Sequence, residues 1–442
     1  MGVSKDYFDE LKMLSEQGDP KAMRELGFCY FYGDQTEVNT LYAIELWEKS
    51  AMSGDAIGQG VFAWALENGN GIERDIEKAF YWYHESAKRG DVNSQFRIAE
   101  GYFYGSIVEQ DNNLAYYWYE KASLQEHSRA QLMMAYMCEN GIGTEVNMDN
   151  AFIWYKKASD NGDIDALLNL ANCYEQGRGT TIDKKKAIEI WEIVSSHGNP
   201  LAMYNLGNAY YNGIDCEKDL QLAMMWYEKA SECGYLKAIY TIGAINYTGE
   251  CGKVDYDKAF ICFKKVYDSQ EIYLPEAKLM LAKCYYLGRG TKEDYSLAKE
   301  LFLEVVEEQG DPEGAYYLGE IYRLGKDVPV DESVAVLWYK KVLDLWYSYD
   351  AAEVNLAFYI LSSYELGLSY ALGRGVNVDY EEANYYWNLA AEKGDADSQY
   401  NLALSYINGY GVSCNIDIAL EWLRMAEKNG STKAKELLEQ II

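Results

Sequence analysis

Glycines recur along this chain at a spacing of 36 residues, and this period constrains the fold more than any other feature. The same interval separates Gly54 from Gly90, Gly162 from Gly198, and Gly198 from Gly234. A fixed period of roughly 20–50 residues is the signature of supersecondary units that stack on their neighbours. A chain of 442 residues is therefore expected to form one repeat array rather than two or three compact globular domains.

Each period contains two stretches with helical spacing. In the first, Ala202, Leu206 and Tyr210 lie on one helical stripe that ends before Gly213. In the second, residues 223–230 read AMMWYEKA, which again places the alanines and the aromatic pair on one face. Apolar residues at offsets of three and four predict amphipathic helices. The alanines and glycines let two helices approach closely, and each pair then needs its neighbours to bury its other face.

Turn and cap residues separate these helices. Glycine adopts the left-handed conformation that ends a helix, and aspartate side chains accept bonds from the first free N–H groups of the next one. We expect the second helix of a repeat to be capped by Asp75, Asp149, Asp183 and Asp379. The aspartates that directly follow the repeat glycines are expected to begin first helices: Asp55, Asp91, Asp163 and Asp395.

This pattern resembles the Sel1-like repeat (SLR) family, a relative of tetratricopeptide repeats with a slightly longer period. The residues that carry the resemblance are Ala202, Leu206, Gly207, Tyr210 and Gly213 in the first half, and Lys258-Ala259 and Glu382-Ala383 in the second. About eleven matches cover almost the whole chain. The expected fold is an all-α, right-handed α-solenoid superhelix of about eleven 36-residue helix-turn-helix repeats with capping helices. The resemblance also implies adaptor roles, including those of bacterial proteins that engage host factors.

The period divides the chain into five segments. An atypical helix at each end is expected to cap the array, and a break in the period is expected to lengthen helices rather than form a loop. The segments are an N-terminal cap at 1–18, repeats one to nine at 19–346, an insertion at 347–358, repeats ten and eleven at 359–430, and a C-terminal cap at 431–442. A shorter insertion is expected at 271–273.

Composition limits the partners and the compartment. The formal net charge is −30, and a surface with this charge repels nucleic acids and anionic membranes. The negative charge serves either to keep the protein soluble or to attract a basic protein partner. Residues 1–18 lack a basic stretch followed by an apolar one, so we expect no secretory signal, and no apolar run approaches the roughly 20 residues needed to span a bilayer. Cys29, Cys173 and Cys284 share one small repeat position, so we expect core packing, reduced thiols and a cytoplasmic location.

Motifs for catalysis and for metals are absent from the sequence. The three histidines fall at different places in separate repeats, and neither HExxH nor Cys-x-x-Cys occurs. Ser296 and Lys299 form a Ser-x-x-Lys element, but its companion motifs are missing and Ala298 between them is the repeat alanine. We therefore expect no metal, no cofactor and no enzymatic activity.

The first helix of each repeat is expected to line the concave face of the solenoid. Aromatic residues interleaved with Asn and Glu are typical of a recognition surface, in which Asn bonds a peptide backbone and Glu selects Lys or Arg. The alternative is that many of these tyrosines pack between repeats. The expected partner-binding residues are Phe28, Phe31, Trp64, Glu67, Glu100, Phe103, Tyr136, Glu139, Asn172, Glu175, Asn208, Tyr211, Tyr247, Lys283, Tyr286, Glu320 and Arg323, with Tyr204, Tyr240 and Tyr316 on a nearby face.

Three functions remain open from the sequence. The first is a non-enzymatic protein–protein interaction scaffold or adaptor that holds a peptide or protein partner in an acidic, aromatic concave groove. The second is a regulatory subunit that inhibits or activates an enzyme by wrapping it. The third and least favoured is a hydrolase, because no nucleophile–base set converges.

Overall fold

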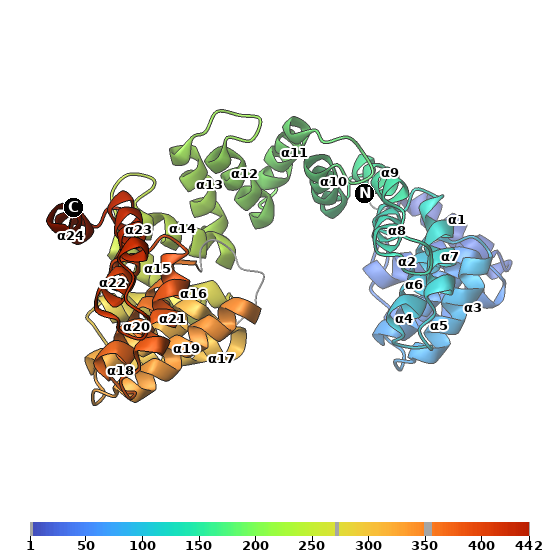
Figure 1. Cartoon of the computed structure of the whole chain (residues 1–442). Helices are drawn as coiled ribbons and strands as arrows, with labels where there is room; N and C mark the ends of the chain where they lie inside the picture. Colours follow the sequence, from blue (N-terminus) through green and yellow to red (C-terminus); the bar gives the residue numbers. More distant parts are fainter. Residues whose placement is uncertain (1–2, 270–273, 349–355, 442) are drawn as a thin grey trace. The chain divides into compact units, whose positions relative to one another are not determined.

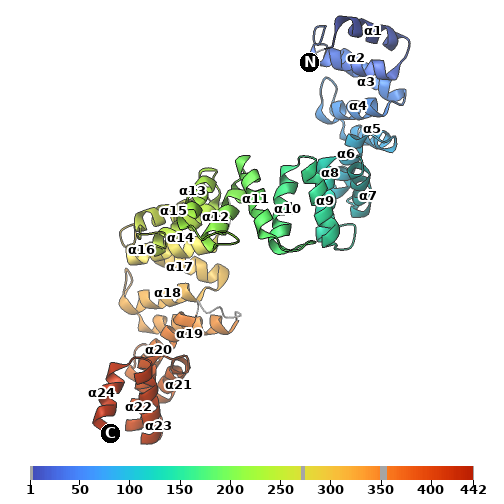
Figure 2. The same ribbon diagram turned by 90° about the horizontal axis from the view of Figure 1, so that it is seen from above.

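The computed structural model describes residues 3–269, 274–348 and 356–441, and in these residues it contains 24 helices and no strand (Figure 1). The chain divides into two compact units, Met1–Trp226 and Tyr227–Ile442. In each unit, helices that follow one another in sequence pack side by side in pairs (Figure 2). The predicted all-α solenoid of helix pairs is confirmed.

The helices alternate between the first and second halves of the repeat. The first helices are α2 (Pro20–Tyr32), α4 (Ala56–Asn68), α6 (Val92–Tyr104), α8 (Ser128–Asn140), α10 (Ile164–Gln176), α12 (Pro200–Asn212), α14 (Leu236–Thr248), α16 (Pro275–Leu287), α18 (Pro312–Leu324), α20 (Leu356–Leu372) and α22 (Ala396–Asn408). The second helices are α3 (Thr40–Met52), α5 (Ile76–Lys88), α7 (Asn112–Ser123), α9 (Met148–Asp160), α11 (Lys184–Ser196), α13 (Leu220–Glu232), α15 (Tyr256–Ser269), α17 (Tyr295–Gln309), α19 (Glu332–Ser348), α21 (Tyr380–Ala391) and α23 (Ile416–Lys428). Two further helices lie at the ends, α1 (Lys5–Glu16) and α24 (Thr432–Ile441).

Seven of the eight aspartates predicted as caps stand at the N-cap of their helix. The Asp55 side chain accepts a bond from the Gly58 N–H at 2.8 Å, and Gly69 ends α4 with a φ of 67°. The predicted cap Asp149 is wrong, because the N-cap of α9 is Asn147 and Asp149 lies in the first turn. The reason is that Asn147 follows the cap position Asp111 by one repeat period, and asparagine caps a helix as well as aspartate does.

Small residues at the helix crossings set the packing distance. An added Cβ at Gly27 would lie 2.3 Å from the indole nitrogen of Trp47, and one at Gly319 would lie 2.5 Å from the Tyr339 ring. Trp47 and Tyr339 are themselves fully buried. The predicted core positions Cys29, Cys173 and Cys284 are buried as well, so the first helix contributes its small residues to the core of each repeat.

Longer helices flank the predicted insertion. Both α19 and α20 contain 17 residues, whereas most helices of the repeat contain 13. Residues 349–355, which lie inside the predicted insertion at 347–358, and the predicted insertion at 271–273 are outside the described residues. Within the part of the chain that the structure describes, no helix has the length and apolar character needed to cross a membrane.

Candidate functional site

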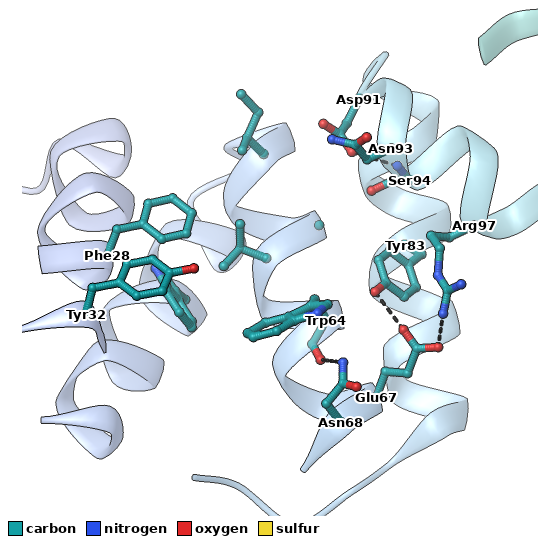
Figure 3. Close-up of a pocket in the computed structure, with 14 residues that line it drawn as sticks. Phe28, Tyr32, Trp64, Glu67, Asn68, Tyr83, Asp91, Asn93, Ser94 and Arg97 are labelled. Atoms are coloured by element: carbon teal, nitrogen blue, oxygen red, sulfur yellow. Dashed lines mark hydrogen bonds and ion pairs between the residues drawn. The ribbon is translucent and has the colours of Figure 1, made fainter. Parts of the chain in front are cut away.

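A pocket of about 550 Å³ opens on the first helices of the N-terminal unit (Figure 3). Helix α4 forms its floor, α2 its aromatic wall, and α6 its polar wall. Its volume lies within the range of roughly 300–1,000 Å³ in which well-formed ligand sites are found. The lining residues are Phe28, Tyr32, Trp47, Ile57, Gly60, Val61, Trp64, Glu67, Asn68, Tyr83, Asp91, Asn93, Ser94 and Arg97.

The aromatic wall is partly exposed. Tyr32 is 71% exposed and stacks on Phe28, with ring centroids 6.4 Å apart, while Phe28 contacts the buried Trp47 edge-on at 5.3 Å. On the floor, Trp64 is 38% exposed and contacts Phe31 at 5.8 Å. Rings fixed by neighbours in this way lose little conformational entropy when a ligand packs on them.

The polar end of the pocket is built around a carboxylate that is already paired. The Tyr83 hydroxyl donates to Glu67 at 2.9 Å, and the Arg97 guanidinium also pairs with Glu67 while bonding Glu100 at 2.7 Å. Burial, followed by the nearby Glu67 carboxylate, raises the pKa of Tyr83. Glu67 therefore connects α4 to α5 and α6. The same three residues, Glu67, Tyr83 and Arg97, also line a second, smaller pocket of about 150 Å³ that extends to Tyr104.

The opposite end of the pocket lies at the start of α6. Asp91 caps this helix by accepting a bond from the Ser94 N–H at 2.8 Å. The Ser94 hydroxyl is fully buried and has no hydrogen-bond partner among the described residues. Asn93 is exposed beside them at the rim, so its amide can reach a ligand backbone.

Only a few of the predicted partner-binding residues meet in this pocket. Phe28, Trp64 and Glu67 line it, and Phe31 supports Trp64. The sequence pattern missed Tyr32, Gly60, Arg97 and the pair Asp91 and Ser94. The feature of the sequence that could have indicated the pocket is Gly60, because the other repeats carry a large side chain at this position.

Other predicted residues of the N-terminal unit lie on their own repeats. Phe103 contacts Tyr136 at 6.4 Å, and Tyr136 is 43% exposed. Glu139 accepts a bond from the Tyr155 hydroxyl at 2.5 Å and pairs with Arg178. The remaining predicted residues of this unit are all half-buried on their first helices: Glu100, Asn172, Glu175, Tyr204, Asn208 and Tyr211.

In the C-terminal unit, several predicted residues are parts of the packing. Glu320 is only 8% exposed, accepts a bond from Tyr339 at 2.6 Å and pairs with Arg323 at 2.7 Å. Lys283 pairs with Glu313 at 2.6 Å. The tyrosines here make ring contacts with the core, Tyr240 with Phe263, Tyr247 with Tyr256, Tyr286 with Phe302, and Tyr316 with Tyr339. These four contacts join the two helices of one repeat. Contacts between adjacent repeats, as the alternative expected, are made by Tyr286 with Tyr317 at 5.0 Å and by Tyr316 with Phe358 at 5.5 Å.

Among the described residues, no group of three or more His, Cys, Asp and Glu side chains is arranged to hold a metal ion. The residues that line the pocket include no histidine, lysine or cysteine, and its buried hydroxyls are those of Ser94 and Tyr83. Its chemistry is that of recognition through rings, carboxylates and amides.

Two solved structures are similar to this chain, and the first has the same fold. A solved structure of c5321, described as a protective antigen present in uropathogenic Escherichia coli strains and displaying an SLR fold, is 24% identical, covers 100% of this chain and 91% of its own, and superposes with a TM-score of 0.81. A Sel1 repeat protein from Oxalobacter formigenes is 25% identical over 50% of this chain and 90% of its own, with a TM-score of 0.46. No curated protein sequence matches at a significant level.

The family comparison covers nearly all of the sequence. The sequence model of the Sel1 repeat matches eleven segments, at 20–55, 59–91, 92–127, 128–163, 164–199, 200–235, 236–269, 275–304, 312–344, 360–395 and 396–431. These segments coincide with the helix pairs of the structure. With eleven matched repeats stacked as helix pairs, the chain belongs to the Sel1 repeat family.

Proposed function

We propose that this chain is a non-enzymatic scaffold that binds a protein or peptide partner on the first-helix face of its N-terminal unit. Sel1 and related helical repeats generally act as protein-interaction scaffolds. The observation that carries the proposal is the pocket over α4, where Tyr32 and Trp64 stay exposed beside hydrogen-bonding side chains. Exposed aromatic anchors next to polar groups are typical of the energetic centre of an interface.

The charges on this face favour a basic partner. Arginines on first helices are each flanked by two carboxylates, so the negative charges outnumber the positive ones at these places. The clusters of this unit are Arg24 with Glu25 and Asp55, Arg97 with Glu67 and Glu100, and Arg129 with Asp163 and Asp165. A residual negative charge at each cluster steers a cationic segment toward the face.

The test is capture of a partner by crosslinking in native extract, repeated with a double variant, Tyr32→Ala with Trp64→Ala. Both side chains are exposed, so the melting temperature should change little while the crosslinks to α2 and α4 disappear. The matched control is Tyr81→Ala with Tyr117→Ala, which removes two exposed aromatic residues from the second helices α5 and α7. If the parent chain, the Tyr32 and Trp64 variant and the control variant all capture the partner equally, the partner binds outside this pocket.

The same experiment addresses the enzyme-regulator alternative. If the captured partner is an enzyme, its activity is compared with and without the chain. A change in turnover that the Tyr32 and Trp64 substitutions remove would support regulation through the pocket, whereas unchanged turnover would support a scaffold.

A further inference from the structure

The pocket exists because one repeat position lacks a side chain. Gly60 lies nine residues before Gly69, the glycine that ends α4. Glycine inside a helix weakens the helix, so nothing in local structure favours it there. At the same distance from the closing glycine, the other repeats carry Arg24, Phe96, Leu132, Leu168, Tyr204, Tyr240, Leu279, Tyr316, Tyr364 and Tyr400.

The preceding repeat shows how a guanidinium fills this position. Arg24 donates to Asp55 at 2.7 Å, and the two side chains are only 11% and 8% exposed. Asp55 also caps α4 by accepting a bond from the Gly58 N–H. One aspartate oxygen therefore serves a helix cap and an arginine at the same time.

In the next repeat the aspartate is present and the arginine is missing. Asp91 follows Asp55 by one period and caps α6 in the same way. Among the described residues Asp91 forms no ion pair, because Gly60 stands where Arg24 would be. A Cβ built on Gly60 would lie 3.2 Å from the Asp91 carboxylate, which is tighter than an ordinary contact. The glycine therefore lets this oxygen lie close to α4, and both residues line the hollow.

A second polar group faces the same hollow. The Cβ built on Gly60 would lie 2.8 Å from the Ser94 hydroxyl, which is fully buried and has no partner among the described residues. A buried hydroxyl without a partner is costly, and a ligand donor or acceptor would remove that cost. In the preceding repeat the corresponding residue is Gly58. In the last repeat it is Ser398, whose hydroxyl is also buried without a partner among the described residues, but there Tyr364 stands at the position of Gly60. The combination of the serine with a glycine at that position is what distinguishes this pocket.

We propose that the pocket receives an arginine side chain from the partner. This inference rests on the proposed scaffold function and names the chemistry of its main site. The guanidinium lies in the hollow over Gly60 and donates to Asp91 and Ser94, while the aliphatic stem packs on Val61 and Trp64. Figure 3 shows Asp91, Ser94 and Trp64 in the pocket. Arginine fits better than lysine because its planar group donates in two directions and stacks on aromatic rings.

The one cation in the pocket lining does not oppose this arrangement. Arg97 lies at the Glu67 end of the pocket, where it bonds both Glu67 and Glu100. Its charge is therefore outnumbered by carboxylates, and Asp91 at the other end has no internal cation among the described residues. The pocket as a whole favours a cationic side chain.

The first test uses N-acetyl-arginine methylamide as the probe, observed through the indole signal of Trp64 by NMR. A Trp64→Phe variant assigns that signal. The expected result is a saturable shift with the arginine probe, binding at least several-fold weaker with the lysine analogue, and no shift with the neutral citrulline analogue. Equal shifts with citrulline or with lysine, or no shift with arginine, would overturn the inference.

Two variants at equivalent caps separate the charge from the helix cap. Asp91→Asn keeps the cap, because asparagine caps as well as aspartate, but it removes the carboxylate charge. It should weaken the arginine probe about tenfold, as loss of a charged partner does. Asp395→Asn changes the corresponding cap of α22 and should leave probe binding unchanged. Unchanged binding by Asp91→Asn contradicts the inference.

A second test fills the pocket from within the chain. The double variant Gly60→Arg with Ser94→Gly recreates the Arg24 and Gly58 arrangement of the preceding repeat. It should melt no lower than the parent chain and should no longer bind the arginine probe. If the double variant fails to fold, binding of the arginine probe to Asp91→Asn still tests the inference. Capture of a partner without arginine-probe binding would leave the scaffold proposal standing and reject this inference.

Discussion

The first-helix face is open in one part of the molecule and filled in another. Over α4, Gly60 leaves a hollow and Trp64 is 38% exposed. Over α18 of the C-terminal unit, Tyr316 occupies the corresponding position and Glu320, which corresponds to Trp64, is 8% exposed. Both sites are built on the same kind of helix pair, so the hollow over α4 comes from side-chain volume at one position rather than from the fold. Exposure alone does not mark such a hollow, because Tyr136, at the position of Trp64, is 43% exposed beside Leu132.

The same comparison explains why acidic residues of this face differ in role. Glu67, Glu139 and Glu320 each accept a hydrogen bond from a tyrosine of the following helix. An acid that accepts such a bond across two helices acts as a packing residue, even where part of it reaches solvent. These three glutamates therefore already have hydrogen-bond partners within the chain, and their selection of Lys or Arg on a ligand stays a prediction.

The largest expected effect is that of Glu320→Lys. The substitution places an ammonium beside Arg323 in a nearly closed site and leaves the Tyr339 hydroxyl without its acceptor. We expect a loss of about 3–5 kcal/mol in the free energy of unfolding, as for a broken buried ion pair. Thermal and urea unfolding followed by circular dichroism measure it.

Glu175→Lys is the matched control for this substitution. Glu175 is half-buried on α10, and its side chain accepts a bond from the neighbouring Gln176 at 3.5 Å. Its replacement should cost less than about 1 kcal/mol, as expected for a surface position. Equal losses for both variants would show that the filled site over α18 is no more closed than the face of α10.

A smaller effect is expected from Tyr339→Phe, which keeps the ring and removes the hydroxyl. Tyr339 is fully buried and donates to Glu320 at 2.6 Å. Because a hydrogen bond to a charged group is lost and Glu320 keeps Arg323 as a partner, we expect a loss of about 1.5–3 kcal/mol. An unchanged urea midpoint would mean that Arg323 alone satisfies Glu320.

The sequence predicted the architecture well because the period, the glycine turns and most caps are local signals. It predicted the site only in part, since the pattern marks which residues lie on first helices but not how they are paired. The partners of Glu67 and Glu320 come from other helices, Tyr83 and Arg97 for the first and Tyr339 for the second. The hollow at Gly60 follows from a missing side chain, which a search for aromatic and charged residues passes over.

The smallest expected effect has the opposite sign and concerns Tyr119, the counterpart of Tyr83 one repeat later. Phe103 stands at the position of Glu67 in this repeat, and the fully buried Tyr119 hydroxyl has no hydrogen-bond partner among the described residues. Tyr119→Phe therefore removes an unsatisfied group and should raise the free energy of unfolding by up to about 1 kcal/mol. Tyr83→Phe, which removes a bond to Glu67, should lower it. If both variants lose stability equally, a group near Tyr119, such as Glu100, satisfies its hydroxyl in solution, and an acid two residues before the closing glycine would then matter less than the pairs at Glu67 and Glu139 indicate.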